Sequence, residues 1–157
     1  MQAASLGVPF QPVAGLRGTD VAASGSFATV RDPYRGEEVY VVPAIRPDWA
    51  VVHVHEADRR GNARLYGSVG YDLVMVEAAA GVILTSEQIV SGEEFEAHPE
   101  RTQIPGIFVD AVVHAPRGAW PCGCAPAYDV DAEGVEAYLA AAGSPDLLRA
   151  YLERIDP

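Results

Sequence analysis

Two histidines on one predicted strand are the first residues of this sequence that could do chemistry. His53 and His55 are two positions apart in the apolar, β-branched run 50–55. Side chains alternate between the faces of a strand, so both imidazoles point to one face, as in a metal dyad. Glu56 and Asp58 are near, but no third ligand follows at a recognisable spacing. We therefore expect histidines that pack or donate hydrogen bonds, without a bound metal.

The turn after this run also has side chains that could line a ligand site. Asp58 occupies the position where a type I turn uses a side-chain acceptor, and Gly61 the position where a left-handed residue reverses the chain. Asn62 could present its amide to a ligand or satisfy its own turn. The simplest interpretation is a hairpin in which a second strand, 63–66, follows the turn.

Glu87 and two cysteines complete the candidates. Glu87 follows the buried run 82–85, where a catalytic carboxylate could be placed, although it could equally stabilise a helix N-terminus at Ser86. Cys122 and Cys124 form a C-x-C without a second Cys or His pair at the spacing of a zinc site. Buried small side chains or a free thiol are the simpler explanation for them.

The composition restricts the class of protein. A chain of 157 residues suits one domain, 1–157, with a sizeable core. The formal charge of −11, with no Lys, argues against a nucleic-acid partner, which needs a basic face. No apolar run is long enough to span a membrane, and the first residues do not form a secretory signal. Two cysteines are too few for a disulfide framework, so we expect a cytoplasmic protein.

Helices and strands alternate along the chain, which predicts an α/β fold: a three-layer open sheet of mixed, largely parallel strands flanked by helices. Asp-Pro and Gly within 32–36 predict a turn between strands 27–30 and 38–42. A helix over 71–80 should end at Gly81 and lead into a buried, parallel strand 82–85.

Further predictions concern the second half of the chain. Ser91 and Glu94 have the spacing of a capping box, which predicts a short helix. The segment 104–115 predicts another strand, and 116–128, rich in Gly, Pro and Cys, an irregular stretch. Asp131 should cap a helix over 132–142 that ends at Gly143. Ser144 and Pro145 should begin a last helix, whose apolar face comprises Leu147, Leu148, Tyr151, Leu152 and Ile155.

The sequence also resembles family I coenzyme A transferases, above all the A-type subunit of the glutaconate CoA-transferase type. The most specific match is ADRRGNA at 57–63, which follows a strand ending in His-x-His and resembles the family's AD-x-x-GN signature. The other matching stretches are LGVPF at 6–10, RGTD at 17–20, DPY at 32–34, VPA at 42–44, AAA at 78–80, TSEQIV at 85–90, IPG at 104–106, VDA at 109–111, APRGA at 115–119 and YD at 128–129.

The resemblance implies acyl-CoA chemistry in which this chain is one part. An A-type subunit is expected to have roughly double this length, and its N-terminal portion, with a glycine-rich GGFGxxGxP loop, has no counterpart here. The family's catalytic glutamate belongs to the B-type partner, so no catalytic residue is expected in this chain. The substrate would be a coenzyme A thioester, and no cofactor is implied. The residues that would line the site are His53, Asp58, Gly61, Asn62 and Glu87.

Three alternatives remain open at this point. The chain could belong to a heteromeric CoA-transferase, together with the missing N-terminal portion of the A-type subunit, and with a B-type partner chain. It could belong to a hydrolase on the same scaffold that opens a ring of a steroid-derived CoA thioester. It could also be a non-catalytic, partner-binding fragment.

Overall fold

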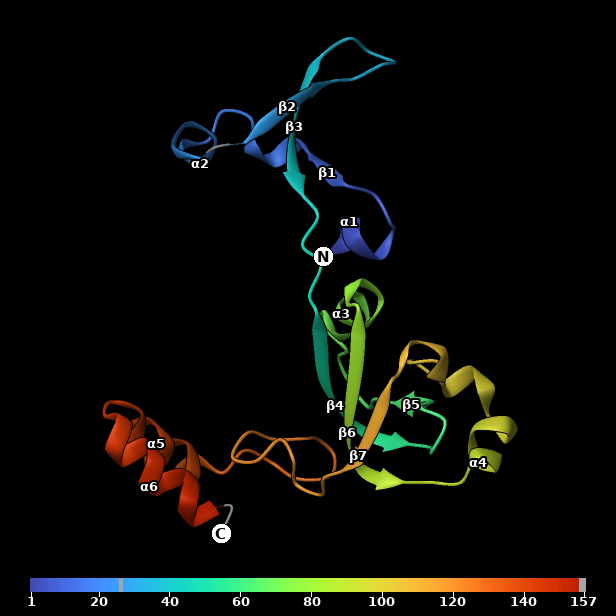
Figure 1. Ribbon diagram of the computed structural model, residues 1–157, viewed down its shortest axis with the longest axis vertical. Coiled ribbons are helices and arrows are strands. Elements are labelled where there is room, and N and C mark those ends of the chain that lie inside the picture. Colours follow the sequence, from blue (N-terminus) through green and yellow to red (C-terminus); the bar gives the residue numbers. More distant parts are fainter. Residues whose placement is uncertain (26, 156–157) are drawn as a thin grey trace.

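A four-stranded mixed sheet forms the centre of the molecule (Figure 1). The computed structural model describes residues 1–25 and 27–155. The sheet order is β5–β4–β6–β7, and the strands are β4 Trp49–Ala57, β5 Ala63–Arg64, β6 Gly81–Ile89 and β7 Ala111–His114. β4, β6 and β7 are parallel, whereas β5 is antiparallel to β4. The predicted α/β fold with a mixed, largely parallel sheet flanked by helices is confirmed.

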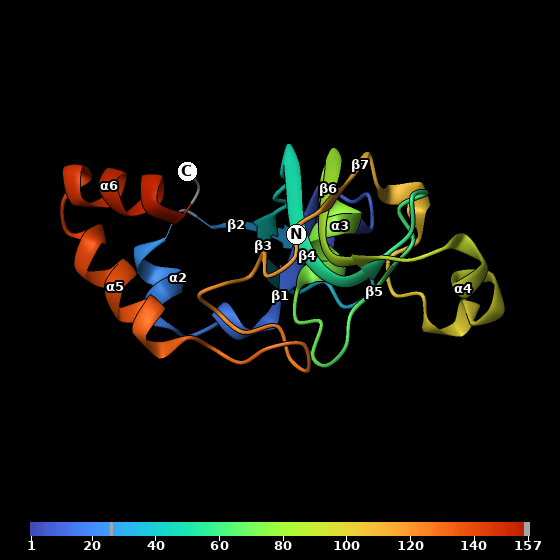
Figure 2. The same ribbon diagram turned by 90° about the horizontal axis from the view of Figure 1, so that it is seen from below.

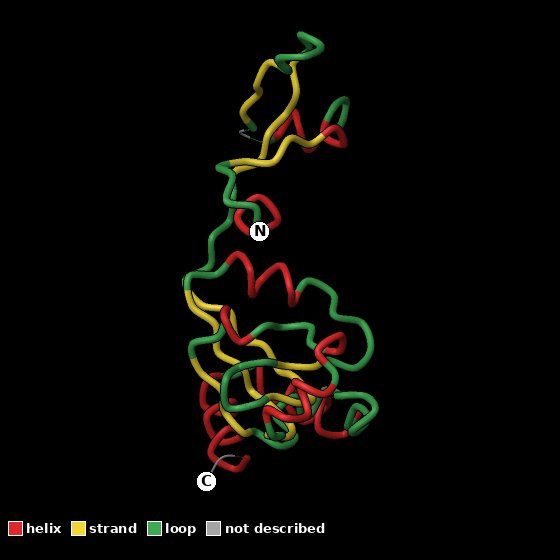
Figure 3. Tube along the Cα trace, turned by 90° about the vertical axis from the view of Figure 1, so that its right-hand side faces the viewer, coloured by secondary structure: helices red, strands yellow, loops and turns green. Residues whose placement is uncertain are grey.

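A second, antiparallel sheet extends from this centre as an arm (Figures 1 and 3). Its order is β1–β3–β2, with β1 Phe10–Val13, β2 Ala28–Arg31 and β3 Glu38–Pro43. The turn between β2 and β3 forms as predicted, because the Asp32 carboxylate accepts the N–H groups of Tyr34 and Arg35 at 2.8 and 3.3 Å. The sequence analysis did not separate this hairpin from the main sheet.

Six α-helices and three 3₁₀ turns complete the described residues. The helices are α1 Gln2–Ser5, α2 Asp20–Ser24, α3 Asp72–Ala78, α4 Gly92–Ala97, α5 Ala132–Ala142 and α6 Pro145–Ile155. The 3₁₀ turns are η1 Ala14–Leu16, η2 Pro99–Arg101 and η3 Gly106–Phe108. Over residues 1–25 and 27–155, no helix is long and apolar enough to cross a membrane.

The core lies between α3 and one face of the main sheet. Alternate residues of β4 (Ala50, Val52 and Val54) and Leu84 of β6 are buried there with Val76 of α3. Burying each valine or leucine side chain contributes roughly 1.5–3 kcal/mol, so this layer holds the sheet and helix together. The alternation also sends the other residues of β4, including both histidines, to the opposite face.

The opposite face of the sheet is apolar and exposed near the amino ends of its strands. Trp49 and Val51 of β4 are 59% and 62% exposed, and Val113 of β7 is 47% exposed. In addition, β5 pairs only with Glu56 and Ala57, so most of β4 has no strand on that side among the described residues. Among the described residues, no second layer of side chains covers this part of the sheet.

Two predictions about helix ends are wrong. α3 ends at Ala78, and Gly81 is the first residue of β6 rather than a helix cap, because its N–H donates to the Asp48 carbonyl. The Trp49 ring lies so close that a Cβ on Gly81 would be 2.5 Å from it, so the glycine admits the indole. α4 follows Ser91 as predicted, but the Ser91 side chain makes no capping hydrogen bond.

Two predicted strands are shorter than expected, the one after the Gly61 turn and the one over 104–115. β5 has only Ala63 and Arg64, and the strand expected over 104–115 is reduced to β7. Ile104 bridges to Ala63 of β5, but the Gly106 N–H then donates to the Asn62 side chain and Gly106–Phe108 form η3. The continuous pairing with β6 therefore begins at Ala111.

The last two helices form as predicted but lie apart from the sheet (Figure 2). The Asp131 carboxylate caps α5 by accepting the Gly134 N–H at 3.0 Å. α5 and α6 pack mainly on each other. Of the apolar face predicted for α6, only Tyr151 is buried, whereas Leu147 is 57% exposed. The sequence pattern identified the face, but little of the described chain covers it.

Candidate functional site

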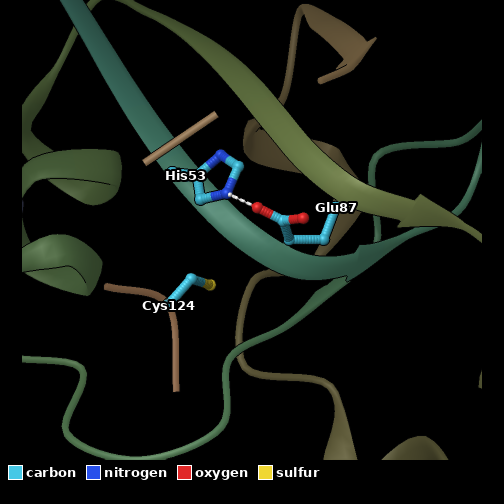
Figure 4. Close-up of side chains that lie close together, drawn as sticks. All are labelled: His53, Glu87 and Cys124. Carbon is cyan, nitrogen blue, oxygen red and sulfur yellow. Dashed lines mark hydrogen bonds and ion pairs between the residues drawn. The ribbon is translucent and has the colours of Figure 1, made fainter. Parts of the chain in front are cut away.

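Glu87, at the carboxyl end of β6, holds the centre of a hydrogen-bond network (Figure 4). Its Oε1 atom lies 2.7 Å from His53 Nε2 and accepts the Tyr128 hydroxyl at 2.7 Å. Its Oε2 atom accepts the Arg117 backbone N–H at 2.8 Å. The Glu87 side chain is only 10% exposed. One carboxylate therefore joins β4, β6 and the irregular segment 116–128.

The parallel register of β4 and β6 brings His53 to Glu87. His53 lies opposite Thr85, and Glu87 is the next residue of β6 on the same face. His53 Nδ1 is 2.9 Å from the Thr85 hydroxyl. In the neutral imidazole, Nε2–H donates to Glu87 and Nδ1 accepts from Thr85. Both ring nitrogens thus have partners supplied by the neighbouring strand.

The segment 116–128 folds over this end of the sheet and supplies the other donors. Arg117 has a φ of 59°, a left-handed conformation that costs a non-glycine residue about 1–2 kcal/mol. This conformation points its N–H at Glu87, and the Ala119 N–H in turn donates to the Tyr128 hydroxyl at 3.0 Å. The strained residue is held by the bond it makes to the carboxylate.

These contacts fix the charge of the network. Burial alone would raise the pKa of Glu87, but hydrogen bonds from Tyr128, Arg117 and His53 outweigh it and lower the pKa below its ordinary value. Burial and the bond to Glu87 raise the pKa of Tyr128 to about 12. Glu87 is therefore an ionised acceptor at neutral pH and a weak base, and Tyr128 is a neutral donor.

His55 belongs to a separate set of contacts beside the network. Its Nδ1 accepts the Tyr66 N–H at 3.1 Å, and its Nε2 donates to the Ala125 carbonyl at 2.8 Å. The Cys124 sulfur lies 3.4 Å from the same Nε2. Burial and the Glu87 charge raise the pKa of Cys124, which makes the thiol a poor nucleophile.

The donor atoms of His53, Glu87 and Cys124 lie within 4.8 Å of one another, close enough to surround an ion. Each of the three nevertheless has hydrogen-bond partners of its own, and a metal would also require a thiolate. We expect no stoichiometric metal, as the sequence indicates. Elemental analysis of the purified chain checks this. Zinc at one equivalent, lost in Cys124→Ala or His53→Ala, would contradict it.

Asp58, Gly61 and Asn62 form a different network, which closes the turn between β4 and β5. Asp58 is 1% exposed, and its Oδ1 accepts the N–H groups of Arg60 and Asn62 at 2.8 and 3.0 Å. Its Oδ2 accepts the Asn62 amide at 2.8 Å, and the Asn62 oxygen accepts the Gly106 N–H at 3.0 Å. Gly61 has a φ of 89°, as expected. These side chains hold the turn and the segment before η3, and they share no hydrogen bond with Glu87.

Sequence reasoning named His53 and Glu87 but missed three of their partners. Thr85 is signalled by the predicted parallel pairing, since it faces the same side as Glu87. Tyr128 lies in the YD stretch of the family resemblance, which gave it no role. Arg117 contributes a backbone N–H, for which no side-chain pattern exists.

A pocket of ≈ 180 Å³ opens beside Glu87, at the carboxyl ends of β4 and β6. Ligands of open α/β sheets commonly bind at this edge. Its lining comes from β4, β6, the segment that follows β5 and the irregular segment: His55, Glu56, Tyr66, Glu87, Gln88, Pro126 and Ala127.

Comparison with known proteins identifies the family of this chain. Residues 1–115 match the family described as Coenzyme A transferase. The chain belongs to the coenzyme A transferase family. The A-type subunit of glutaconate CoA-transferase from Acidaminococcus fermentans is 35% identical over 87% of this chain and 48% of its own length. A cholesterol ring-cleaving hydrolase IpdA subunit of Mycobacterium tuberculosis is 33% identical over 92% of this chain and 53% of its own.

Two solved structures have the same fold. The crystal structure of glutaconate coenzyme A-transferase from Acidaminococcus fermentans has a TM-score of 0.88 and 32% identity, covering 98% of this chain and 54% of that one. A variant of the decarboxylase AibA/AibB has a TM-score of 0.83 and 38% identity, covering 98% and 55%. The chain spans about half the length of these relatives. The resemblance to part of an A-type subunit is confirmed.

Proposed function

We propose that this chain is part of a heteromeric CoA-transferase, which moves coenzyme A between an acyl-CoA thioester and a carboxylic acid. The observation that carries the proposal is the match of residues 1–115 to the coenzyme A transferase family. The partners would be the remaining portion of the A-type subunit, and a B-type chain, since relatives of this chain are named as A-type subunits. The substrate is an acyl-CoA, and the catalytic glutamate lies outside this chain.

The proposed reaction is covalent and proceeds in two halves. A glutamate carboxylate of the complex attacks the thioester carbonyl and expels the coenzyme A thiolate, which leaves a mixed acyl-glutamyl anhydride. The thiolate then attacks the glutamyl carbonyl of this anhydride, so the acyl group leaves as its carboxylate and coenzyme A stays on the enzyme as a glutamyl thioester. The second acid then takes the coenzyme A, which returns the glutamate carboxylate. One thioester is consumed and one is formed, so no oxidant or energy source is required.

Glu87 is unsuited to be the attacking carboxylate. Three donors occupy its two oxygens, and the lowered pKa makes it less nucleophilic than an ordinary glutamate. Its place in the proposed enzyme is to hold the segment 116–128 over the carboxyl ends of β4 and β6. His53 and Thr85 position that carboxylate from the sheet.

The similarity to the IpdA subunit favours a second candidate. In that case the chain would belong to a hydrolase that opens a ring of a steroid-derived CoA thioester. The two activities differ in their products, because a transferase needs an acceptor acid and a hydrolase needs only water. A third possibility is a non-catalytic fragment that binds partners.

The isolated chain is expected to show no CoA-transferase turnover, because the attacking glutamate and the main oxyanion donors are not among its assigned residues. Purified chain should be assayed with acetyl-CoA and a panel of carboxylates. Adding the B-type chain and the remaining portion of the A-type subunit should restore exchange with ping-pong kinetics. A borohydride-sensitive CoA adduct on the isolated chain would contradict the assignment, and ring opening without an acceptor acid would favour the hydrolase.

The exposed apolar face of the sheet predicts that the isolated chain self-associates. Trp49 and Val51 are more than half exposed there, and such faces are normally covered by another layer. Sedimentation over a concentration series should show an average mass that rises with concentration, and Val51→Ser should reduce the rise. Val21→Ser, at a 56% exposed position on α2, is the matched control. A monomer at all concentrations would contradict the proposal that a missing portion covers this face.

A further inference from the structure

Glu87 has an acceptor position that none of the described residues uses. A carboxylate offers about four lone-pair positions. Oε1 has two partners, His53 and Tyr128, whereas Oε2 has only the Arg117 N–H. Glu87 also lines the ≈ 180 Å³ pocket. A nearly buried, ionised carboxylate that lines a pocket and has a free acceptor position is suited to accept a hydrogen bond from a ligand.

The charges around this pocket select the kind of ligand. Glu56 also lines it, but the buried Arg64 guanidinium pairs with Glu56 at 3.2 Å. No arginine side chain makes an ion pair with Glu87 among the described residues. A carboxylate or phosphate would therefore meet an uncompensated negative charge, whereas an uncharged N–H or O–H donor would be attracted.

The walls of the pocket fit a narrow, uncharged chain. The His55 and Tyr66 rings form one side, with their centroids 5.0 Å apart, and both His55 nitrogens are already bonded within the protein. Pro126 and Ala127 form an apolar side, and Gln88 adds an exposed amide. A pocket of this size lies below the roughly 300–1,000 Å³ typical of sites for larger ligands such as nucleotides.

We propose that this pocket binds the pantetheine arm of the coenzyme A thioester, with an amide N–H of the arm donating to Glu87 Oε2. The inference rests on the proposed function, which supplies coenzyme A as the ligand. Of the parts of an acyl-CoA, the nucleotide end is anionic and a hydrocarbon acyl group has no donor. The pantetheine arm is uncharged and contains two amide N–H groups and a hydroxyl, so it matches both the charge and the free acceptor.

The binding test uses the 157-residue chain and S-methylpantetheine, which has no free thiol to react with the exposed Cys122. We expect the backbone amide signals of His55, Tyr66, Gln88 and Ala127 to shift in a ¹⁵N NMR titration. The dissociation constant should be on the order of millimolar, as suits a small fragment. Adenosine bisphosphate, the probe for the nucleotide end, should leave these signals unchanged. Unchanged signals with S-methylpantetheine, or equal shifts with both probes, would overturn the proposal.

Two variants test the site itself. Ala127→Leu fills the pocket at an exposed residue that makes no hydrogen bond to Glu87, and Ala142→Leu, at the exposed end of α5, is its matched control. Ala127→Leu should weaken S-methylpantetheine binding at least about tenfold. Glu87→Gln should also weaken it by about tenfold or more, since hydrogen bonds to charged groups are the stronger ones. Binding unaffected by Ala127→Leu would refute the pocket, whatever Glu87→Gln does to folding.

The reconstituted enzyme separates this inference from the proposed function. If coenzyme A is transferred, Ala127→Leu should raise the KM for the acyl-CoA and leave the KM for the acceptor acid unchanged. If coenzyme A is transferred but Ala127→Leu changes neither KM, the pantetheine assignment is wrong and the proposed transferase activity is still supported. If the chain binds S-methylpantetheine but the reconstituted complex does not transfer coenzyme A, the pocket assignment is supported and the proposed function is wrong.

Discussion

Replacing Asp58 with alanine is expected to lower the free energy of unfolding by about 3–4 kcal/mol. The carboxylate is 1% exposed and accepts three hydrogen bonds, from the N–H groups of Arg60 and Asn62 and from the Asn62 amide. Alanine leaves those donors without an acceptor and frees Asn62, which holds Gly106. For a chain of this length the melting temperature should fall by roughly 10 °C.

Two control variants separate the lost acceptor from a general effect of the substitution. Asp58→Asn keeps an oxygen for the two backbone N–H groups but turns an amide towards the Asn62 amide, so we expect a loss of about 1–2 kcal/mol. Asp48→Ala, at an exposed aspartate whose side chain makes no hydrogen bond to the described residues, should change stability by less than about 0.5 kcal/mol. Urea unfolding followed by circular dichroism measures all three. A loss in Asp58→Ala no greater than in Asp48→Ala would show that the turn is not held by this carboxylate.

Replacing Gly61 with alanine is the second change expected to have a large effect, about 3 kcal/mol of unfolding free energy. Gly61 has a φ of 89°, and an added Cβ would lie 2.7 Å from the Val109 Cβ and 3.3 Å from the Gly106 backbone. The substitution therefore combines an unfavourable backbone conformation with a clash against the segment that the turn holds. Thermal and urea unfolding of the variant measure the loss.

Gly67 provides a matched control for the clash. Its φ of 103° is also unfavourable for alanine, but an added Cβ would meet nothing within 4 Å. Gly67→Ala should therefore cost only the backbone part, about 1–2 kcal/mol. Equal losses for the two alanine variants would show that backbone conformation alone accounts for Gly61 and that the approach of Val109 is unimportant.

Both predictions concern the family's AD-x-x-GN stretch, for which two interpretations were open. Its residues could line a ligand site or satisfy their own turn. In the structure the polar atoms of Asp58 and Asn62 bond within the turn and to Gly106, so the stretch shapes the chain that leads into β7. A structural role explains why these residue types stand at this spacing.

The local patterns of the sequence determined much of the fold. The Asp32 and Asp58 turns and the Asp131 cap are each formed by contacts within a few residues. Such contacts depend on backbone preferences and side-chain reach, which a sequence displays directly. The order of the matching stretches likewise indicated the coenzyme A transferase family, to which the chain belongs.

Where local signals competed with distant ones, tertiary packing decided the outcome. Gly81 has the pattern of a helix end, yet the pairing of its N–H with Asp48 and the nearby Trp49 ring place it in a strand. The segment 104–110 has the composition of a strand, yet the bond from Gly106 to Asn62 and the η3 turn separate the β-bridge at Ile104 from β7.

The candidate site was likewise predicted in part from the sequence and completed by tertiary contacts. The sequence alone identified His53 and Glu87 as residues that could do chemistry. The parallel register of β4 and β6 in the structure puts them on one face. Only the tertiary structure joined them to Tyr128 and to the Arg117 N–H, 41 and 30 residues away from Glu87. Those bonds lower the pKa of Glu87, which also lines the pocket. The reason is physical: the charge of a buried carboxylate depends on every donor that reaches it, and those donors come from segments brought together by folding.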